Sequence, residues 1–191
     1  TDYASIKSAL AHAETEAGHI DILVNNSGVS TTQRLVDVTP DDYQYVMDTN
    51  LRGAFFVAQE AAKRMILRGK ADPSRQHRII NIASVAGLRV LSQIGVYCMS
   101  KAGVVQMTKA MALEWGRYGI NVNALCPGYI ETEINREYFR SEGGRKLVDM
   151  LPRKRVGKPE DLDALLLLLA SDESRFINGA IMTADDGMSA F

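Results

Sequence analysis

The sequence predicts an α/β fold in which a doubly wound parallel sheet is covered by helices on both faces. Short apolar segments that end in small or polar residues alternate along the chain with helical patterns. Strands that alternate with helices form right-handed units with parallel strands. The chain has 191 residues, 46% of them hydrophobic and 24% charged, which suits one globular domain and excludes a disordered tail.

The composition also excludes several classes of partner. With 22 basic and 23 acidic residues the formal net charge is -1, so no charged surface for nucleic acid or an anionic membrane is expected. The longest apolar run, 164–170, is far shorter than the roughly 20 residues of a membrane span. Cys98 and Cys126 are too few for a disulfide framework, and the three histidines show no metal-ligand spacing with them. We therefore expect a cytoplasmic protein without a metal site.

The N-terminal third of the chain reads as helix, strand and helix. Asp2 is a suitable N-cap for a helix that Gly18 ends. The apolar segment 20–24 predicts a buried strand. Thr39 begins a long helical pattern that continues to about Arg68.

The central part repeats this alternation. A second strand is predicted at 78–82, a helix at 95–118 that Gly119 ends, and a third strand at 120–125. The stretch 129–158 is polar and only weakly periodic. Each strand ends in small or polar residues, and ligands bind at this carboxyl edge in open parallel sheets.

The C-terminal part predicts one more helix and one more strand. Pro159 opens the helix, which runs through Ala170, and 180–183 is the last strand.

Tyr97 and Lys101 are the strongest local indication of chemistry. At positions i and i+4 they share one face of a helix, and a nearby ammonium group would lower the tyrosine pKa from its ordinary value near 10. The same spacing also occurs by chance in many helices, where a half-exposed tyrosine lies over a solvated lysine.

The surrounding residues favour a site over chance. Ser84 ends a strand thirteen residues before Tyr97. Asn50 lies inside a helix, where asparagine has poor propensity. A turn of Asn26, Ser27 and Gly28 follows one strand, and Pro127 with Gly128 follows another. Each feature has an ordinary structural explanation, but their joint order along the chain is hard to explain by chance.

With these motifs the chain resembles the classical short-chain dehydrogenase/reductase family. The resemblance implies a Rossmann-like, three-layer α/β/α fold and a catalytic tetrad of Asn50, Ser84, Tyr97 and Lys101. It also implies that NAD or NADP is the cofactor, bound by Asn26, Ser27, Gly28, Tyr97, Lys101, Pro127, Gly128, Ile130 and Thr132. The ending Ala184-Asp185-Asp186-Gly187 is similar to the Val-Asp-Gly-Gly ending of the family, with altered residues.

The sequence departs from the family at its N-terminal side. It has no Thr-Gly-x-x-x-Gly-x-Gly turn, whose amides hold the cofactor pyrophosphate at a helix N-terminus. The resemblance therefore implies one N-terminally incomplete domain, 1–191, without the first three strands. It also implies a substrate lid at about 129–151.

The mechanism implied is hydride transfer between a nicotinamide and a small-molecule carbonyl or secondary alcohol. Tyr97 would be the general acid or base, Lys101 would lower its pKa, Ser84 would hold the substrate oxygen, and Asn50 would hold a relay water.

Two functional alternatives remain open at this stage. The chain could be an active oxidoreductase, or a non-catalytic fragment that keeps assembly surfaces but cannot bind dinucleotide. For an active enzyme, both a 3-oxoacyl-carrier-protein reductase and a sugar or polyol dehydrogenase are possible. Tyr118 stands before Gly119, where carrier-protein reductases often have a basic residue, and this weakens the first. The resemblance also implies a homo-oligomer, either dimer or tetramer.

Overall fold

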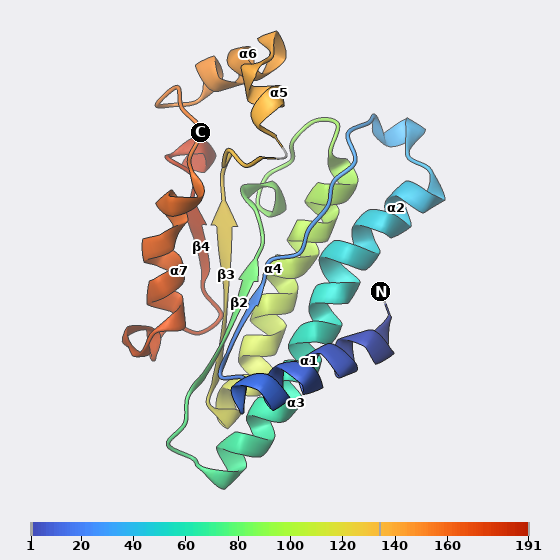
Figure 1. Ribbon diagram of the computed structural model, residues 1–191. Helices are drawn as coiled ribbons and strands as arrows, with labels where there is room; N and C mark the ends of the chain where they lie inside the picture. Colours follow the sequence, from blue (N-terminus) through green and yellow to red (C-terminus); the bar gives the residue numbers. More distant parts are fainter. Residues whose placement is uncertain (1, 134, 191) are drawn as a thin grey trace.

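Four parallel strands form the centre of the structure (Figure 1). This computed structural model describes residues 2–133 and 135–190. The strands pair in chain order and are β1 (Ile22–Asn25), β2 (His77–Ile82), β3 (Ile120–Pro127) and β4 (Ile181–Ala184). Because every pair is parallel, all four carboxyl ends lie at the same edge of the sheet.

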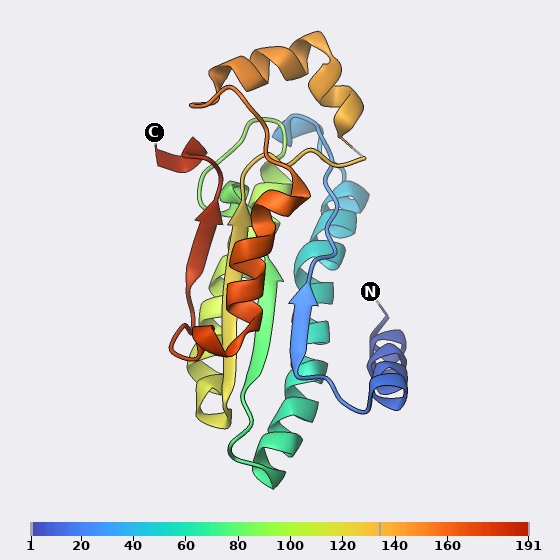
Figure 2. The same cartoon turned by 60° about the vertical axis from the view of Figure 1, so that its left-hand side comes forward.

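Helices cover both faces, as the three layers in Figures 1 and 2 show. On one face α3 (Ala54–Ala71) and α4 (Gly95–Trp115) pack on the strands, and α1 (Tyr3–Ala17) packs outside α3. On the other face α7 (Asp163–Ala170) packs on β2 and β3. The predicted α/β architecture is confirmed.

The predicted helix boundaries have the expected local chemistry. The Asp2 side chain accepts hydrogen bonds from the first-turn amides of α1, and Gly18 ends that helix with a φ of 77°. The next helix, α2 (Pro40–Met47), begins with a capping box between Thr39 and Asp42. Gly119 follows α4 and a short 3-10 turn with a φ of 74°, a conformation that favours glycine.

One expectation about helices is wrong. The pattern predicted as one helix, 41–68, is divided into α2 and α3 by a π-helical turn, Asp48–Gly53. Periodicity alone cannot show such a turn, because the turn inserts only one extra residue into a continuous helical register.

The weakly periodic stretch that follows β3 contains two helices, α5 (Arg136–Arg140) and α6 (Glu142–Met150). Ser141 caps α6 by accepting a hydrogen bond from the Gly144 amide. Both helices lie over the carboxyl edge of the sheet (Figures 1 and 2). Residue 134, which belongs to the predicted lid, lies outside the described residues.

Strand β1 is an edge of the sheet among the strands described. The expectation of a buried strand at 20–24 is wrong: the Ile22 and Val24 side chains are 48% and 40% exposed, because α7 packs on β2 and β3. No helix within the ranges 2–133 and 135–190 is long and apolar enough to cross a membrane.

Candidate active site

Tyr97 and Lys101 lie in the first turns of α4, directly behind the carboxyl end of β2. Lys101 is only 4% exposed, and its Nζ donates a hydrogen bond of 2.7 Å to the Ile82 carbonyl. The same Nζ lies 5.7 Å from the centre of the Tyr97 ring, a cation–π distance. The helix therefore holds the two side chains together, as their spacing predicts.

Burial changes the pKa of both groups. It lowers the pKa of Lys101 to about 8, because the ammonium has lost its hydration. Burial also raises the pKa of Tyr97, and a hydrogen bond with Ser84 opposes this only in part. Burial is therefore the larger effect on the tyrosine pKa, and the lowering of this pKa by Lys101 stays a prediction.

Ser84 lies where β2 turns towards α4, and its hydroxyl faces the phenol of Tyr97. The two side chains are hydrogen-bonded, and the Ser84 Oγ also accepts a hydrogen bond of 3.1 Å from the Ala86 amide. The structure therefore brings together two residues of the tetrad that the resemblance implies. A substrate oxygen placed between the two hydroxyls could bond to both.

Asn50 belongs to the π-helical turn and is 1% exposed. Its Oδ1 accepts a hydrogen bond from the Val29 amide, and its Nδ2 donates one to the Val29 carbonyl, both of 2.8 Å. Its other amide hydrogen goes to the Ser100 Oγ at 3.0 Å. Asn50 thus links the segment after the 26–28 turn to α4, and its water relay stays a prediction.

The turn of Asn26, Ser27 and Gly28 is exposed at the end of β1. A Cβ added at Gly28 would lie 3.4 Å from the Lys101 Nζ and 3.6 Å from the Asn50 Oδ1. Glycine therefore leaves a shallow cradle beside the lysine. The cradle offers one donor, the Lys101 Nζ, and one acceptor, the Asn50 Oδ1, and this pair fits a sugar hydroxyl, as the nicotinamide ribose would require.

The segment after β3 is the second predicted cofactor contact. A Cβ at Gly128 would lie 2.8 Å from Asp185 atoms, so close packing alone requires glycine there. Ile130 forms a parallel bridge with Gly157 at the base of the lid. The Thr132 side chain is exposed, and its amide donates a hydrogen bond of 2.7 Å to the Asn135 Oδ1.

Sequence reasoning missed several asparagines that position these segments. Asn135 also donates to the Ile130 carbonyl at 2.9 Å. Asn25, just before the 26–28 turn, donates to the Asn81 Oδ1 at 2.9 Å, and Asn81 donates to the Thr108 Oγ1 at the same distance. The signal available in the sequence for Asn25 and Asn81 was a polar residue within an otherwise apolar strand.

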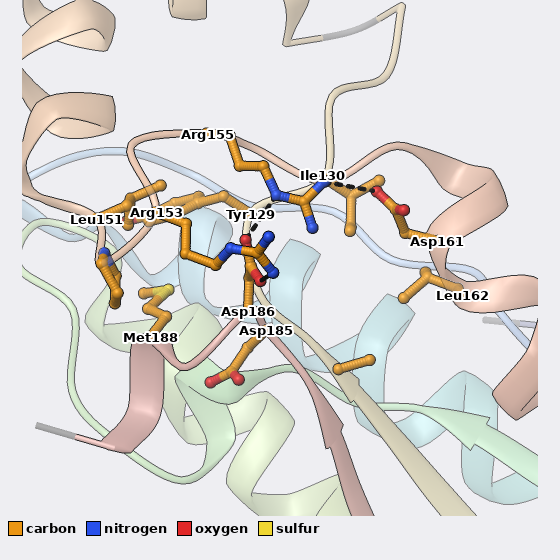
Figure 3. Close-up of a pocket in the computed structure, with 13 residues that line it drawn as sticks. Tyr129, Ile130, Leu151, Arg153, Arg155, Asp161, Leu162, Asp185, Asp186 and Met188 are labelled. Atoms are coloured by element: carbon orange, nitrogen blue, oxygen red, sulfur yellow. Dashed lines mark hydrogen bonds and ion pairs between the residues drawn. The ribbon is translucent and has the colours of Figure 1, made fainter.

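A small pocket of about 200 Å³ lies beside the base of the lid (Figure 3). Arg153 and Arg155, at its rim, form ion pairs of 3.0 and 2.7 Å with the two oxygens of Asp186. Asp186 has a φ of 55°, in the family ending where glycine is usual. Its carboxylate ties the segment that follows α6 to the segment after β4.

Comparisons with known proteins show the family to which the chain belongs. A family model described as enoyl-(acyl carrier protein) reductase matches residues 1–189. A 2-dehydro-3-deoxy-D-gluconate 5-dehydrogenase of Escherichia coli is 37% identical over 187 residues, which cover 97% of this chain and 72% of the relative. The chain belongs to the short-chain dehydrogenase/reductase family. An acetoacetyl-CoA reductase of Shinella zoogloeoides is 35% identical, covering 98% of this chain and 75% of that protein.

Solved structures of short-chain dehydrogenases/reductases confirm the fold. A gluconate 5-dehydrogenase from Burkholderia cenocepacia, in complex with NADP and tartrate, superimposes with a TM-score of 0.92 at 37% identity. The match covers 100% of this chain and 72% of that one. The predicted family, the Rossmann-like fold and the class of NAD- or NADP-dependent oxidoreductase are confirmed.

Replacing Lys101 by methionine tests the burial of its ammonium. The pKa of Lys101 is about 8 in the folded protein, below the ordinary 10.5. Lys101 therefore contributes stability that is fully present above pH 10.5, and this stability is lost as the pH falls through the folded-state pKa of about 8. We expect the free energy of unfolding of the wild type, relative to Lys101→Met, to rise by about 2 kcal/mol between about pH 7 and about pH 9.5. Urea denaturation at both pH values measures this difference.

The matched control is Lys109→Met, which removes an exposed lysine from the same helix. We expect its effect on stability to be the same at both pH values. A Lys101→Met effect that also does not change with pH would contradict a buried charge.

Proposed function

We propose that this chain carries the catalytic half of a dehydrogenase for a small polyhydroxylated alcohol, with a sugar acid or polyol as the substrate class. The observation that carries the proposal is the meeting of two hydroxyls, Ser84 and Tyr97, above the buried Lys101 ammonium. Relatives that act on sugar acids and polyols support the substrate class. The substrate class is tested by comparing the turnover of gluconate and simple polyols with the turnover of acetoacetyl-CoA.

In this mechanism Tyr97 and Ser84 act on the substrate oxygen. The Ser84 hydroxyl donates a hydrogen bond that stabilises negative charge on this oxygen. The Tyr97 phenol gives its proton to this oxygen in reduction, and the Tyr97 phenolate takes the hydroxyl proton in oxidation. Because burial raises the pKa of Tyr97, the phenol stays protonated at neutral pH, and this suits its action as an acid.

The nicotinamide cofactor, when bound, supplies the hydride chemistry. Lys101 and the cradle at Gly28 would hold its ribose, and Ile130 and Thr132 would contact the nicotinamide end. Asn50 orients the 26–28 segment through Val29. The lid helices α5 and α6 would exclude water from the reacting atoms.

The other proposals concern organisation. Residues 1–191 would form one domain. Both cysteines are free and buried, which suits a reducing compartment such as the cytoplasm.

The change Tyr97→Phe tests the acid–base role. In a longer form, in which the family's glycine-rich segment precedes these residues, we expect a loss of turnover of about 100-fold or more. Only the phenolic hydroxyl is removed, so the melting temperature should change little. The absorbance of the reduced nicotinamide measures turnover. Tyr45→Phe, at an exposed tyrosine of α2, is the control. Turnover of Tyr97→Phe within a few-fold of wild type would remove Tyr97 from the chemistry.

The non-catalytic alternative is favoured by one observation, the absence of a glycine-rich turn from the sequence. We expect NADH and NADPH to bind these 191 residues far more weakly than they bind the longer form, because no amides cradle the pyrophosphate. Calorimetry on both forms measures the affinities. Equal affinity would show that the residues described here suffice for binding.

We further propose that two copies pair through α3 and α4. A groove of about 650 Å³ runs between these helices, and its apolar lining includes Leu51, Phe55, Ile66, Met107, Met111 and Trp115. Charges of both signs, Arg52 and Lys63 with Asp48 and Glu114, border the same groove. A second copy, rotated by a two-fold axis, would present the same apolar stripe with its charges reversed in order.

Light scattering of the longer form at micromolar concentration tests this pairing. We expect a dimer or tetramer for the wild type and a smaller species for Phe55→Glu, since the glutamate would bury a charge in the interface. Val36→Glu changes a side chain that is 85% exposed outside the groove and should leave the assembly intact. A wild-type monomer would disprove the pairing.

A further inference from the structure

Ser100 lies between Tyr97 and Lys101 on α4, and its side chain is completely buried. Its hydroxyl donates a hydrogen bond of 2.8 Å to the backbone carbonyl of Tyr97. The same oxygen accepts a hydrogen bond of 3.0 Å from the Asn50 Nδ2. Ser100 therefore connects the turn of helix that carries Tyr97 to the side chain that crosses from the π-helical turn.

Asn50 continues this connection to the cofactor side of the site. Its Oδ1 and its second Nδ2 hydrogen pair with the amide and the carbonyl of Val29, each at 2.8 Å. Val29 directly follows the turn at 26–28. A continuous path of hydrogen bonds thus runs from this turn through Asn50 and Ser100 to the backbone of Tyr97.

Every side-chain hydrogen of Asn50 and Ser100 that can be donated is used in this path. Both hydrogens of the Asn50 amide are used, so a lost hydroxyl at position 100 leaves one of them unpaired in a side chain that is 1% exposed. An unpaired buried donor is costly, and Asn50 would rotate or shift to find another acceptor. Val29, held at both of its peptide groups, would move with it.

We propose that Ser100 is a positioning residue that couples the placement of the 26–28 turn to the placement of Tyr97. This inference rests on the proposed function, in which the turn holds the nicotinamide ribose and Tyr97 acts on the substrate. Hydride transfer requires these two groups to be aligned closely, and small displacements reduce the rate strongly. Ser100 touches neither the substrate nor the cofactor; it acts through Asn50.

The test compares Ser100→Ala with Ser174→Ala. Ser174 is also completely buried, and its hydroxyl donates to the Leu169 and Ser171 carbonyls, far from the site in sequence. In the longer form we expect Ser100→Ala to lower kcat by about 10-fold or more and to weaken NADH or NADPH binding several-fold. Ser174→Ala should lower the melting temperature but change neither quantity. Equal effects of the two variants on kcat and cofactor affinity would overturn the proposal.

Two further readouts separate positioning from a general loss of stability. The cofactor dissociation constants of Ser100→Ala, Asn50→Ala and the double variant should be strongly non-additive, since both changes break one path. Additive effects would overturn the coupling. Hydrogen exchange at the Val29 amide, which needs no cofactor, should be faster in Ser100→Ala than in Ser174→Ala.

The exchange experiment also distinguishes a failure of the coupling from a failure of the proposed function. Faster exchange at Val29 in a protein without nicotinamide-linked turnover would support the coupling and contradict the proposed function. Unchanged exchange in an active enzyme would contradict the coupling alone.

Discussion

Buried backbone groups at the ends of parallel strands must find hydrogen-bond partners, and in this molecule asparagine side chains supply many of them. Each strand leaves the sheet through a loop whose peptide groups have no neighbouring strand to pair with. Asn50 pairs with both peptide groups of Val29. On β3, Asn123 donates to the Ile177 carbonyl and accepts from the Ala180 amide, and so holds the loop that leads into β4.

The candidate site depends on these loops being held in place. The Asn25–Asn81–Thr108 series joins β1, β2 and α4 just below the carboxyl edge. Above it, the Asn50–Ser100 bond joins the next loop to the same helix. Side-chain amide hydrogen bonds therefore hold the 26–28 turn, the predicted cofactor contact, at a fixed distance from the turn of α4 that carries Tyr97. A loose, solvated edge would not keep two reacting groups in register.

Charged groups differ in their burial between the two sides of the carboxyl edge of the sheet. Beneath Tyr97 a single lysine is buried, and the loss of hydration lowers its pKa to about 8. At the base of the lid, Arg153 and Arg155 share the Asp186 carboxylate at the surface (Figure 3). Exposed ion pairs of this kind contribute little stability.

The sequence by itself determined the order of the strands and helices along the chain and the caps at Asp2 and Thr39. These follow from local periodicity, from turn chemistry and from the rule that parallel strands share one carboxyl edge. The grouping of Ser84 with Tyr97 followed from the resemblance of the motifs to those of the family. Only the tertiary structure decided the π-helical turn around Asn50, the partners of Ser100 and the direction of the Tyr97 pKa. Each of these depends on contacts between residues far apart in the chain, and on the burial those contacts create. Neither these long-range contacts nor this burial can be read from the local sequence pattern.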